Sequence, residues 1–158
     1  MCGIFGIKNK KSHKVNCDFN LLNHRGPDYF GSFTNDNGLY LAHNRLSIIG
    51  LDNLSDQPMH GSSGTVIVFN GEIYNYKELK KTELSDYPFK SKSDTEVILA
   101  LYEKHGLDCV HYLRGMFAFA IWDEKNKRLF CARDRFGVKP FYFINTEEHF
   151  VFASEMKA

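Results

Sequence analysis

The chain has 158 residues, of which 43% are hydrophobic and 25% charged, and its formal net charge is +1 at pH 7. This composition fits one soluble globular domain, residues 1–158, long enough to bury roughly 68–70% of its unfolded surface. The sequence has no clustered basic face, no apolar run of 18 residues and no signal-peptide pattern at its start. These features argue against nucleic-acid binding, a membrane span and export, so we expect a cytoplasmic protein.

The first third of the chain predicts strands around one short helix. Residues 2–7 alternate small and apolar side chains, which is typical of a buried strand. Residues 17–24 could form a short helix that a Gly-Pro turn ends. Residues 29–34 and 38–46 flank the sequence Asn-Asp-Asn-Gly, which is a strong hairpin signal.

The middle of the chain predicts one strand followed by helices. Residues 65–70 form a β-branched run that we expect to be a central strand, with Gly71 directly after it. Residues 75–84 predict a polar helix. Ser93-Asp94-Thr95-Glu96 has the pattern of a capping box and opens an amphipathic helix that ends at His105-Gly106. A short second helix is predicted over residues 108–113.

The last third predicts strands again. Residues 116–122 are almost wholly apolar, and residues 128–134, 140–144 and 149–154 are expected to continue from them as a meander. Strands, then helices, then strands predict an α+β fold in which two antiparallel sheets carry helices on their outer faces. The last residues, Glu-Met-Lys-Ala, favour a helix and have no cap after them, so a further element is expected to follow.

Cysteine occupies the second position, where its chemistry depends on Met1. Removal of Met1 would leave Cys2 with a free α-amine beside its thiol. A terminal amine has a pKa of about 7.7–8.0, so it can act as a base next to a nucleophile that reacts as thiolate. If Met1 stays, no such amine exists. Position alone also allows Cys2 to be a small buried residue before a strand.

The other cysteines and the histidines give no metal-binding pattern. Cys2, Cys17, Cys109 and Cys131 include no C-x-x-C pair, which argues against a zinc site and against a dense disulfide framework. The histidines lack ligand spacing such as H-x-x-x-H, and no phosphate loop of the form G-x-x-x-x-G-K-[ST] is present. We therefore expect no metal and no bound nucleotide in this domain.

Nine short motifs are spread over the whole chain. They are Met1-Cys2-Gly3-Ile4-Phe5-Gly6, His24-Arg25-Gly26-Pro27-Asp28, Arg45-Leu46-Ser47-Ile48-Ile49, Asp56-Gln57-Pro58-Met59, Asn70-Gly71-Glu72-Ile73-Tyr74-Asn75, Ser93-Asp94-Thr95-Glu96, Arg114-Gly115-Met116-Phe117-Ala118-Phe119-Ala120, Arg133-Asp134-Arg135-Phe136-Gly137 and Ser154-Glu155-Met156-Lys157-Ala158. In this order they resemble the class II glutamine amidotransferase domain of the asparagine synthetase type. This domain is an N-terminal nucleophile hydrolase, and the resemblance implies a four-layer α/β/β/α sandwich.

The resemblance also assigns roles to residues. Cys2 would be the nucleophile, and the Asn70 side chain with the Gly71 backbone N–H would form the oxyanion hole. The α-carboxylate of glutamine would bind the guanidinium of Arg45, and its α-ammonium would bind Asp94 with help from Glu72. The remaining predicted substrate-binding residues contribute their backbone to the same wall: Leu46, Ser47, Ile48 and Ile49.

The implied activity is hydrolysis of L-glutamine to glutamate and ammonia. The ammonia would pass to a C-terminal synthetase domain that uses ATP and Mg²⁺, most simply for asparagine synthesis, and this domain itself would need no cofactor. Three alternatives stay open: another acceptor such as a sugar carboxylate, an amine transfer as in aminosugar or purine-precursor synthesis, and an inactive docking or regulatory module. A homodimer is also left open.

Two further pairs are given structural roles. His24 and Arg25 are expected to shape a mobile loop near the pocket, and Asp134 with Arg135 is expected to form a structural ion pair beside the turn at Gly137.

Overall fold

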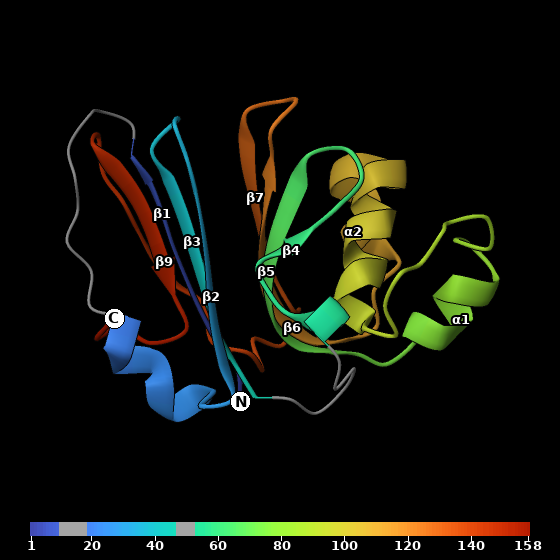
Figure 1. Ribbon diagram of the computed structural model, residues 1–158, viewed down its shortest axis with the longest axis horizontal. Helices are drawn as coiled ribbons and strands as arrows, with labels where there is room; N and C mark the ends of the chain where they lie inside the picture. Colours follow the sequence, from blue (N-terminus) through green and yellow to red (C-terminus); the bar gives the residue numbers. More distant parts are fainter. Residues whose placement is uncertain (10–18, 47–52) are drawn as a thin grey trace.

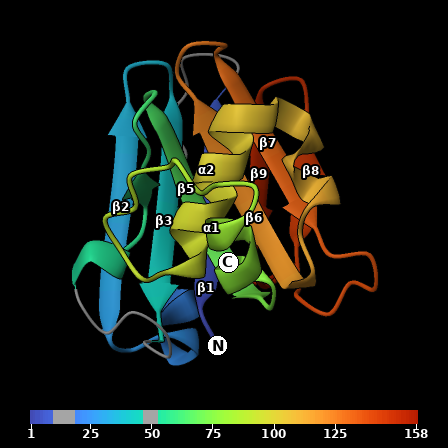
Figure 2. The same cartoon turned by 90° about the vertical axis from the view of Figure 1, so that its right-hand side faces the viewer.

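The computed structural model describes residues 1–9, 19–46 and 53–158, and it shows two antiparallel sheets packed face to face (Figure 1). Helices cover the outer face of one sheet, as the view turned by 90° confirms (Figure 2). The predicted α+β class and the sandwich of two antiparallel sheets are therefore confirmed. Among the described residues, the helical element on the outer side of the other sheet is a short 3-10 helix.

The first sheet, called sheet A, has five strands in the order β2-β3-β1-β9-β8. Its central strand β1 pairs with β3 on one side and with β9 on the other, so residues from both ends of the chain share one sheet. The predicted hairpin is present, since β2 and β3 pair directly across the turn. The strands are β1 Gly3–Asn9, β2 Tyr29–Asn35, β3 Leu39–Arg45, β8 Tyr142–Asn145 and β9 His149–Ala153.

The second sheet, called sheet B, has four strands in the order β4-β5-β6-β7. Strand β4 pairs with only two residues of β5, so the later part of β5 has a neighbour in the sheet on the β6 side alone. The strands are β4 Met59–His60, β5 Thr65–Ile73, β6 Gly115–Asp123 and β7 Arg128–Arg133.

Along the chain, α1, α2 and η3 lie between β5 and β6, η1 lies between β1 and β2, and η2 lies between β3 and β4. Helix α2 packs on sheet B, and α1 lies beside it (Figure 1). The 3-10 helix η1 contacts β1 and β3 and lies next to the C-terminal residues. The elements are α1 Tyr76–Lys81, α2 Asp94–His105, η1 Phe19–Arg25, η2 Asn53–Ser55 and η3 Gly106–His111.

The core is divided between the layers by strand alternation. Successive side chains of a strand point to opposite faces of the sheet. In β5, Ile67 and Phe69 therefore pack toward α2, whereas Val66 and Val68 face sheet A. The layer between the sheets consists of Ile4, Leu39, Leu41, Val66, Val68, Ala118, Ala120, Trp122 and Phe152.

Three sequence expectations about the elements were wrong. The strand expected over residues 65–70 continues through Ile73, so Gly71 and Glu72 also lie within β5 and pair with β6. The last strands do not form one meander, because β7 belongs to sheet B and β8 to sheet A. Local alternation predicts a strand but cannot assign it to a sheet, since pairing depends on residues far apart in sequence.

The third concerns the capping box, which is only half formed. The Ser93 hydroxyl accepts from the Thr95 N–H at 3.1 Å and caps α2. The Glu96 carboxylate does not reach back to Ser93; it accepts from the backbone N–H groups of Lys90 and Ser91. Glu96 therefore fixes the loop before the helix to the first turn of α2.

Candidate active site

The predicted site residues meet at one end of the layer between the sheets. Alternation in β3 places His43 and Arg45 on the same face as Leu41, and in β5 it places Asn70 and Glu72 on the same face as Val68. At this end polar side chains replace the apolar core. They surround a cavity of about 110 Å³ lined by Met1, Cys2, His43, Arg45, Leu46, Ser55, Gln57, Phe69, Asn70, Gly71, Glu72, Ser93, Asp94, Thr95, Met116 and Lys139.

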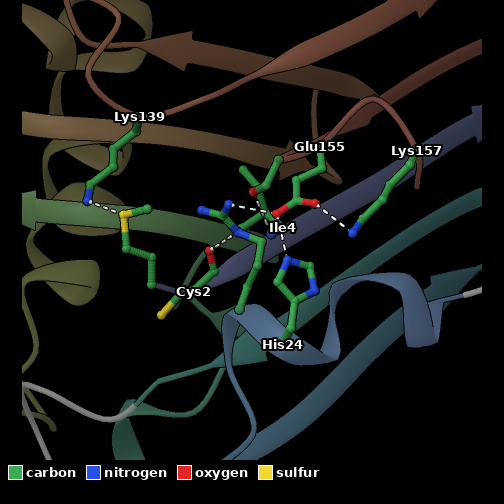
Figure 3. A network of polar contacts seen from close by, with 9 residues as sticks. Cys2, Ile4, His24, Lys139, Glu155 and Lys157 are labelled. Atoms are coloured by element: carbon green, nitrogen blue, oxygen red, sulfur yellow. Dashed lines mark hydrogen bonds and ion pairs between the residues drawn. The ribbon is translucent and has the colours of Figure 1, made fainter.

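Cys2 lies directly before β1 and is held by contacts on both sides. Its Sγ lies 3.4 Å from the backbone nitrogen of Leu46 and 3.6 Å from the carbonyl oxygen of Leu46. On the other side, Nε of Arg25 donates to the Cys2 carbonyl oxygen at 3.0 Å (Figure 3). Arg25 also donates to Glu155 at 3.0 Å. The thiol of Cys2 is thus placed in the cavity while its backbone is fixed from η1.

The contacts of His24 and Arg25 correct the expectation of a mobile loop. His24 contacts Glu155 at 2.8 Å, and Lys157 lies 3.2 Å from the same carboxylate (Figure 3). Ionisation of Glu155 is opposed by partial burial, but bonds from Arg25, His24 and Lys157 outweigh this and lower the pKa of Glu155 to about 2. His24 and Arg25 both belong to η1, and their contacts connect the N-terminal residues to the C-terminal segment.

Arg45 is the buried guanidinium of the cavity. Its Nη1 donates to the Asp56 carboxylate at 2.5 Å, and the Arg45 side chain is only 8% exposed. A guanidinium carries five N–H donors in a planar fork that matches the geometry of a carboxylate, so Arg45 is the side chain of this cavity suited to bind a ligand carboxylate. Asp56 was quoted in a motif but was not predicted as a site residue. Its contact makes it the residue that orients Arg45.

Asn70 has a donor that the protein itself does not use. The residue is 1% exposed, and among the described residues no acceptor lies within hydrogen-bond distance of its Nδ2. A buried polar group without a partner costs free energy, and natural proteins rarely keep one. An unpaired N–H that lines a cavity therefore indicates a group prepared for a ligand oxygen.

The backbone N–H of Gly71 points to the same edge of β5. The flanking N–H groups of Phe69 and Ile73 donate to Gln57 Oε1 at 2.6 Å and to Asp94 Oδ2 at 2.9 Å, and neither partner belongs to β6. Alternate residues of a strand direct their N–H groups to the same edge, so the Gly71 N–H also points away from β6. Two donors, Asn70 and Gly71, are therefore available at adjacent positions.

Gly71 is required by its neighbour strand. A Cβ at this position would lie 2.2 Å from the carbonyl oxygen of Met116 and 2.7 Å from the Cα of Phe117. Close approach of the β6 backbone therefore explains this glycine, because it leaves no room for a side chain.

The acidic groups of the cavity come from β5 and from the start of α2. Burial raises the pKa of Asp94 above its usual value, while the Ile73 N–H opposes this rise and the nearby Glu72 adds to it. Asp94 therefore binds a proton more readily than a surface carboxyl, and a bound cation would restore its charge. This pair of carboxyls is suited to hold an ammonium group.

The sequence interpretation missed His43 and Gln57. His43 is fully buried, and burial lowers its pKa to about 3, so the ring is neutral at physiological pH. Its Nε2 lies 3.1 Å from the Phe69 carbonyl oxygen, which can only accept; Nε2 therefore carries the proton. Gln57 accepts from Phe69 N and donates to Thr95, which joins β5 to α2. Strand alternation with Arg45 was the signal that could have found His43.

The remaining sequence predictions fall into three groups. Cys2, Arg45, Leu46, Asn70, Gly71, Glu72 and Asp94 lie around one cavity. Ser47, Ile48 and Ile49 lie outside the described residues. The ion pair of Asp134 with Arg135 was wrong: the ion pairs of the described ranges do not include it, and Asp134 accepts from the N–H groups of Phe117, Phe136, Val138 and Lys139.

Within residues 1–9, 19–46 and 53–158, no group of three His, Cys, Asp or Glu side chains is arranged to hold a metal ion. No helix in these ranges is long and apolar enough to cross a lipid bilayer.

Comparisons with known proteins agree with the geometry. The family model for the glutamine amidotransferase domain matches residues 1–158. Asparagine synthetase [glutamine-hydrolyzing] 2 of Bacillus subtilis (strain 168) is 41% identical over the whole chain, and asparagine synthetase B [glutamine-hydrolyzing] of Escherichia coli (strain K12) is also 41% identical over the whole chain. The chain spans 22% and 30% of the length of these two relatives.

A solved structure supports the fold independently. The glutamine phosphoribosylpyrophosphate amidotransferase of B. subtilis, solved in complex with ADP and GMP, superposes with a TM-score of 0.78. The match covers 99% of this chain and 42% of that chain at 20% sequence identity. At this identity the similarity establishes the shared fold.

Proposed function

The chain belongs to the glutamine amidotransferase domain family, and from this premise we propose that it hydrolyses L-glutamine to glutamate and ammonia with Cys2 as the nucleophile. The observation that carries the proposal is the meeting of a thiol, a guanidinium, a carboxyl pair and the unpaired side-chain N–H of Asn70, with the Gly71 backbone beside it, around one cavity. Each group matches one chemical feature of glutamine.

The substrate would be held by its two charged groups. Arg45, which Asp56 holds in place, would bind the α-carboxylate through its guanidinium. Asp94 and Glu72 would bind the α-ammonium at the other wall of the cavity. Binding of both charged groups directs the carboxamide of the glutamine side chain toward Cys2, and this positioning supplies part of the rate acceleration. Ser47, Ile48 and Ile49 are kept as proposed backbone contacts next to Leu46.

The chemical step would begin when Met1 has been removed. The Cys2 α-amine takes the thiol proton, directly or through a water, and the sulfur attacks the carboxamide carbon. Negative charge then develops on the carboxamide oxygen, which the Asn70 Nδ2–H and the Gly71 N–H stabilise. The C–N bond breaks as the protonated amine returns its proton to the leaving ammonia. A γ-glutamyl thioester remains, and water hydrolyses it to glutamate.

The ammonia would serve a synthetase domain outside these residues. The two curated relatives are more than three times longer than this chain and are glutamine-hydrolysing asparagine synthetases by name. We therefore propose asparagine as the product, with ATP and Mg²⁺ used in that domain. The free thiols of Cys2, Cys109 and Cys131 suit a reducing compartment such as the cytoplasm.

An exposed apolar face suits the docking of that domain. Phe143 and Ile144 on the edge strand β8 are 63% and 65% exposed, and Met156 is 80% exposed. They line a groove of about 290 Å³ that also includes Ala158. Large apolar side chains gathered on one face mark an interaction surface.

The activity is tested by steady-state assays of glutamate and ammonia release from glutamine. Purified chain that begins at Cys2 should release both in equal amounts, and Cys2→Ala should release neither while keeping its melting temperature. Near-normal hydrolysis by Cys2→Ala would disprove the mechanism. Glutamine binding without hydrolysis in the processed wild type would support an inactive docking module.

The docking face is tested in a protein that carries both this domain and the proposed synthetase domain. Ile144→Asp should lower glutamine-dependent amidation and leave ammonia-dependent amidation unchanged, because only the transfer of ammonia between domains needs the contact. Equal loss of both activities, or loss of neither, would contradict the assignment of this face.

A further inference from the structure

Lys139 is a buried ammonium that the proposed mechanism does not use. It lies between β7 and β8, is 6% exposed and lines the same cavity as Cys2. Its Nζ lies 3.3 Å from the Sδ of Met1 (Figure 3). Among the ion pairs of the described residues, none includes Lys139. A buried cation paired only with a thioether is costly, so its position calls for an explanation.

The loop before Lys139 is built to fix this position. The Asp134 carboxylate accepts from the backbone N–H of Val138 at 2.9 Å and of Lys139 at 3.0 Å. Arg133 donates to the carbonyl oxygens of Gly137 and Lys139 at 2.7 and 2.6 Å. Partial burial opposes ionisation of Asp134, but its N–H partners outweigh this and hold the pKa of Asp134 below its usual value. Carboxylate and guanidinium together hold the backbone that carries the Lys139 side chain.

Removal of Met1 changes what Lys139 faces. The thioether that contacts Nζ leaves with Met1, and the nitrogen of Cys2 becomes a terminal amine on a residue that lines the same cavity as Lys139. The other charged or titratable groups around Cys2 come from η1, β3, β5, α2 and the C-terminal segment: Arg25, His43, Arg45, Glu72, Asp94 and Glu155. Arg25 and Arg45 are ion-paired with Glu155 and Asp56, and His43 is neutral.

We propose that Lys139 is a positioning residue that keeps the α-amine of Cys2 in its uncharged, basic form and favours the Cys2 thiolate. A fixed positive charge disfavours a second positive charge beside it and stabilises a negative one. A free terminal amine is mostly protonated at pH 7, because its ordinary pKa is about 7.7–8.0. A general base works best when its pKa is close to the working pH, and a nearby ammonium moves the amine in that direction.

The experiment measures alkylation of Cys2 by iodoacetamide as a function of pH in chain that begins at Cys2, without glutamine. Peptide mass spectrometry separates Cys2 from the other thiols. Burial raises the pKa of Cys109 and of Cys131 to about 12, so both react slowly near neutral pH. Lys139→Met should move the midpoint of Cys2 alkylation upward by about one pH unit, and Lys139→Arg should leave it near the wild-type value.

Lys125→Met is the matched control, because it removes the same charge from an exposed position. Lys125 lies in the turn between β6 and β7, and this turn follows the end of β6 that is farther from the cavity. It should not move the midpoint. An unchanged midpoint of Cys2 alkylation in Lys139→Met would overturn the proposal. A midpoint in Lys139→Arg that is shifted as far as in Lys139→Met would also overturn it. If Lys139→Met does not fold, Lys139→Gln provides the same test, with a thermal melt to confirm folding.

The inference rests on the proposed function but can fail separately from it. A second readout is the acid limb of the kcat/KM profile for glutamine, which should shift upward with the alkylation midpoint. A higher KM at an unshifted profile would instead make Lys139 a substrate contact and contradict the proposal. If the midpoint shifts but wild type does not hydrolyse glutamine, the proposed function fails while the role of Lys139 toward Cys2 stands.

Discussion

Asn70 gives the sharpest separation between a catalytic and a structural role. Its Nδ2–H would stabilise an oxyanion that exists only in the transition state, so Asn70→Ala should lower kcat and kcat/KM together by about 10²–10³-fold with little change in KM. This corresponds to about 2.7–4 kcal/mol of transition-state stabilisation.

The same contact pattern predicts what happens to stability. Among the described residues Nδ2 has no partner, so Asn70→Ala removes no donated hydrogen bond and relieves a desolvation cost on the order of 1–3 kcal/mol. The lost side-chain volume opens into an existing cavity. The melting temperature should therefore stay constant or rise while the activity falls.

The assay is steady-state glutaminase kinetics on processed wild type and Asn70→Ala, each with a thermal melt. Val68→Ala is the control, because Val68 lies two residues earlier on the same face of β5 and is fully buried in the apolar layer. It should lower the free energy of unfolding by about 2 kcal/mol and leave kcat nearly unchanged. An Asn70→Ala variant whose loss of activity follows a loss of melting temperature would refute the oxyanion role.

Three further outcomes are expected. Arg45→Lys should raise KM for glutamine by about 10- to 100-fold with a smaller effect on kcat, because lysine cannot fork onto a carboxylate; an unchanged KM would place the carboxylate clamp elsewhere. Since burial raises the pKa of Asp94 above 3.8 and the clamp needs the ionised form, KM measured by initial rates should increase as the pH falls through this raised value, and Asp94→Asn should have a high KM at every pH. Glu155 has its pKa lowered from 4.5 to about 2, so its bonds stabilise the fold above pH 4.5 and are lost as the pH falls toward 2. Thermal melts should show Glu155→Gln below wild type at pH 6, with the difference disappearing near pH 2; a constant difference would contradict this.

Most strands could be predicted from local patterns, because the alternation of apolar and polar side chains can be recognised within a short segment. The hairpin of β2 and β3 and the apolar strand β6 follow from turn residues and side-chain period alone. The extension of β5 beyond Asn70 to Ile73 could not be predicted, because the glycine that follows asparagine favours a turn locally. Pairing with β6 and the bonds from Gln57 and Asp94 override that preference.

The site residues likewise divide into those that could be predicted from the sequence and those that could not. Cys2, Arg45 and Asn70 were predicted because they belong to motifs that resemble the glutamine amidotransferase family. Strand alternation with Arg45 could have indicated His43. The contacts of Asp56 and Lys139 form only in the folded chain, so no local pattern assigns their roles. Arg25 contacts Cys2 across 23 positions and Lys139 contacts Met1 across 138. Only the three-dimensional arrangement shows that a loop after β7 reaches the N-terminal residue.

The central claim is that a free α-amine on Cys2 is the base of the reaction. It is tested most directly by preparing the chain behind a cleavable tag and comparing glutaminase activity before and after cleavage that leaves Cys2 first, with intact mass recorded for both. The account predicts that glutamate release appears only after cleavage, although both forms melt at the same temperature. Equal release by the uncleaved form, whose Cys2 nitrogen is an amide, would contradict it.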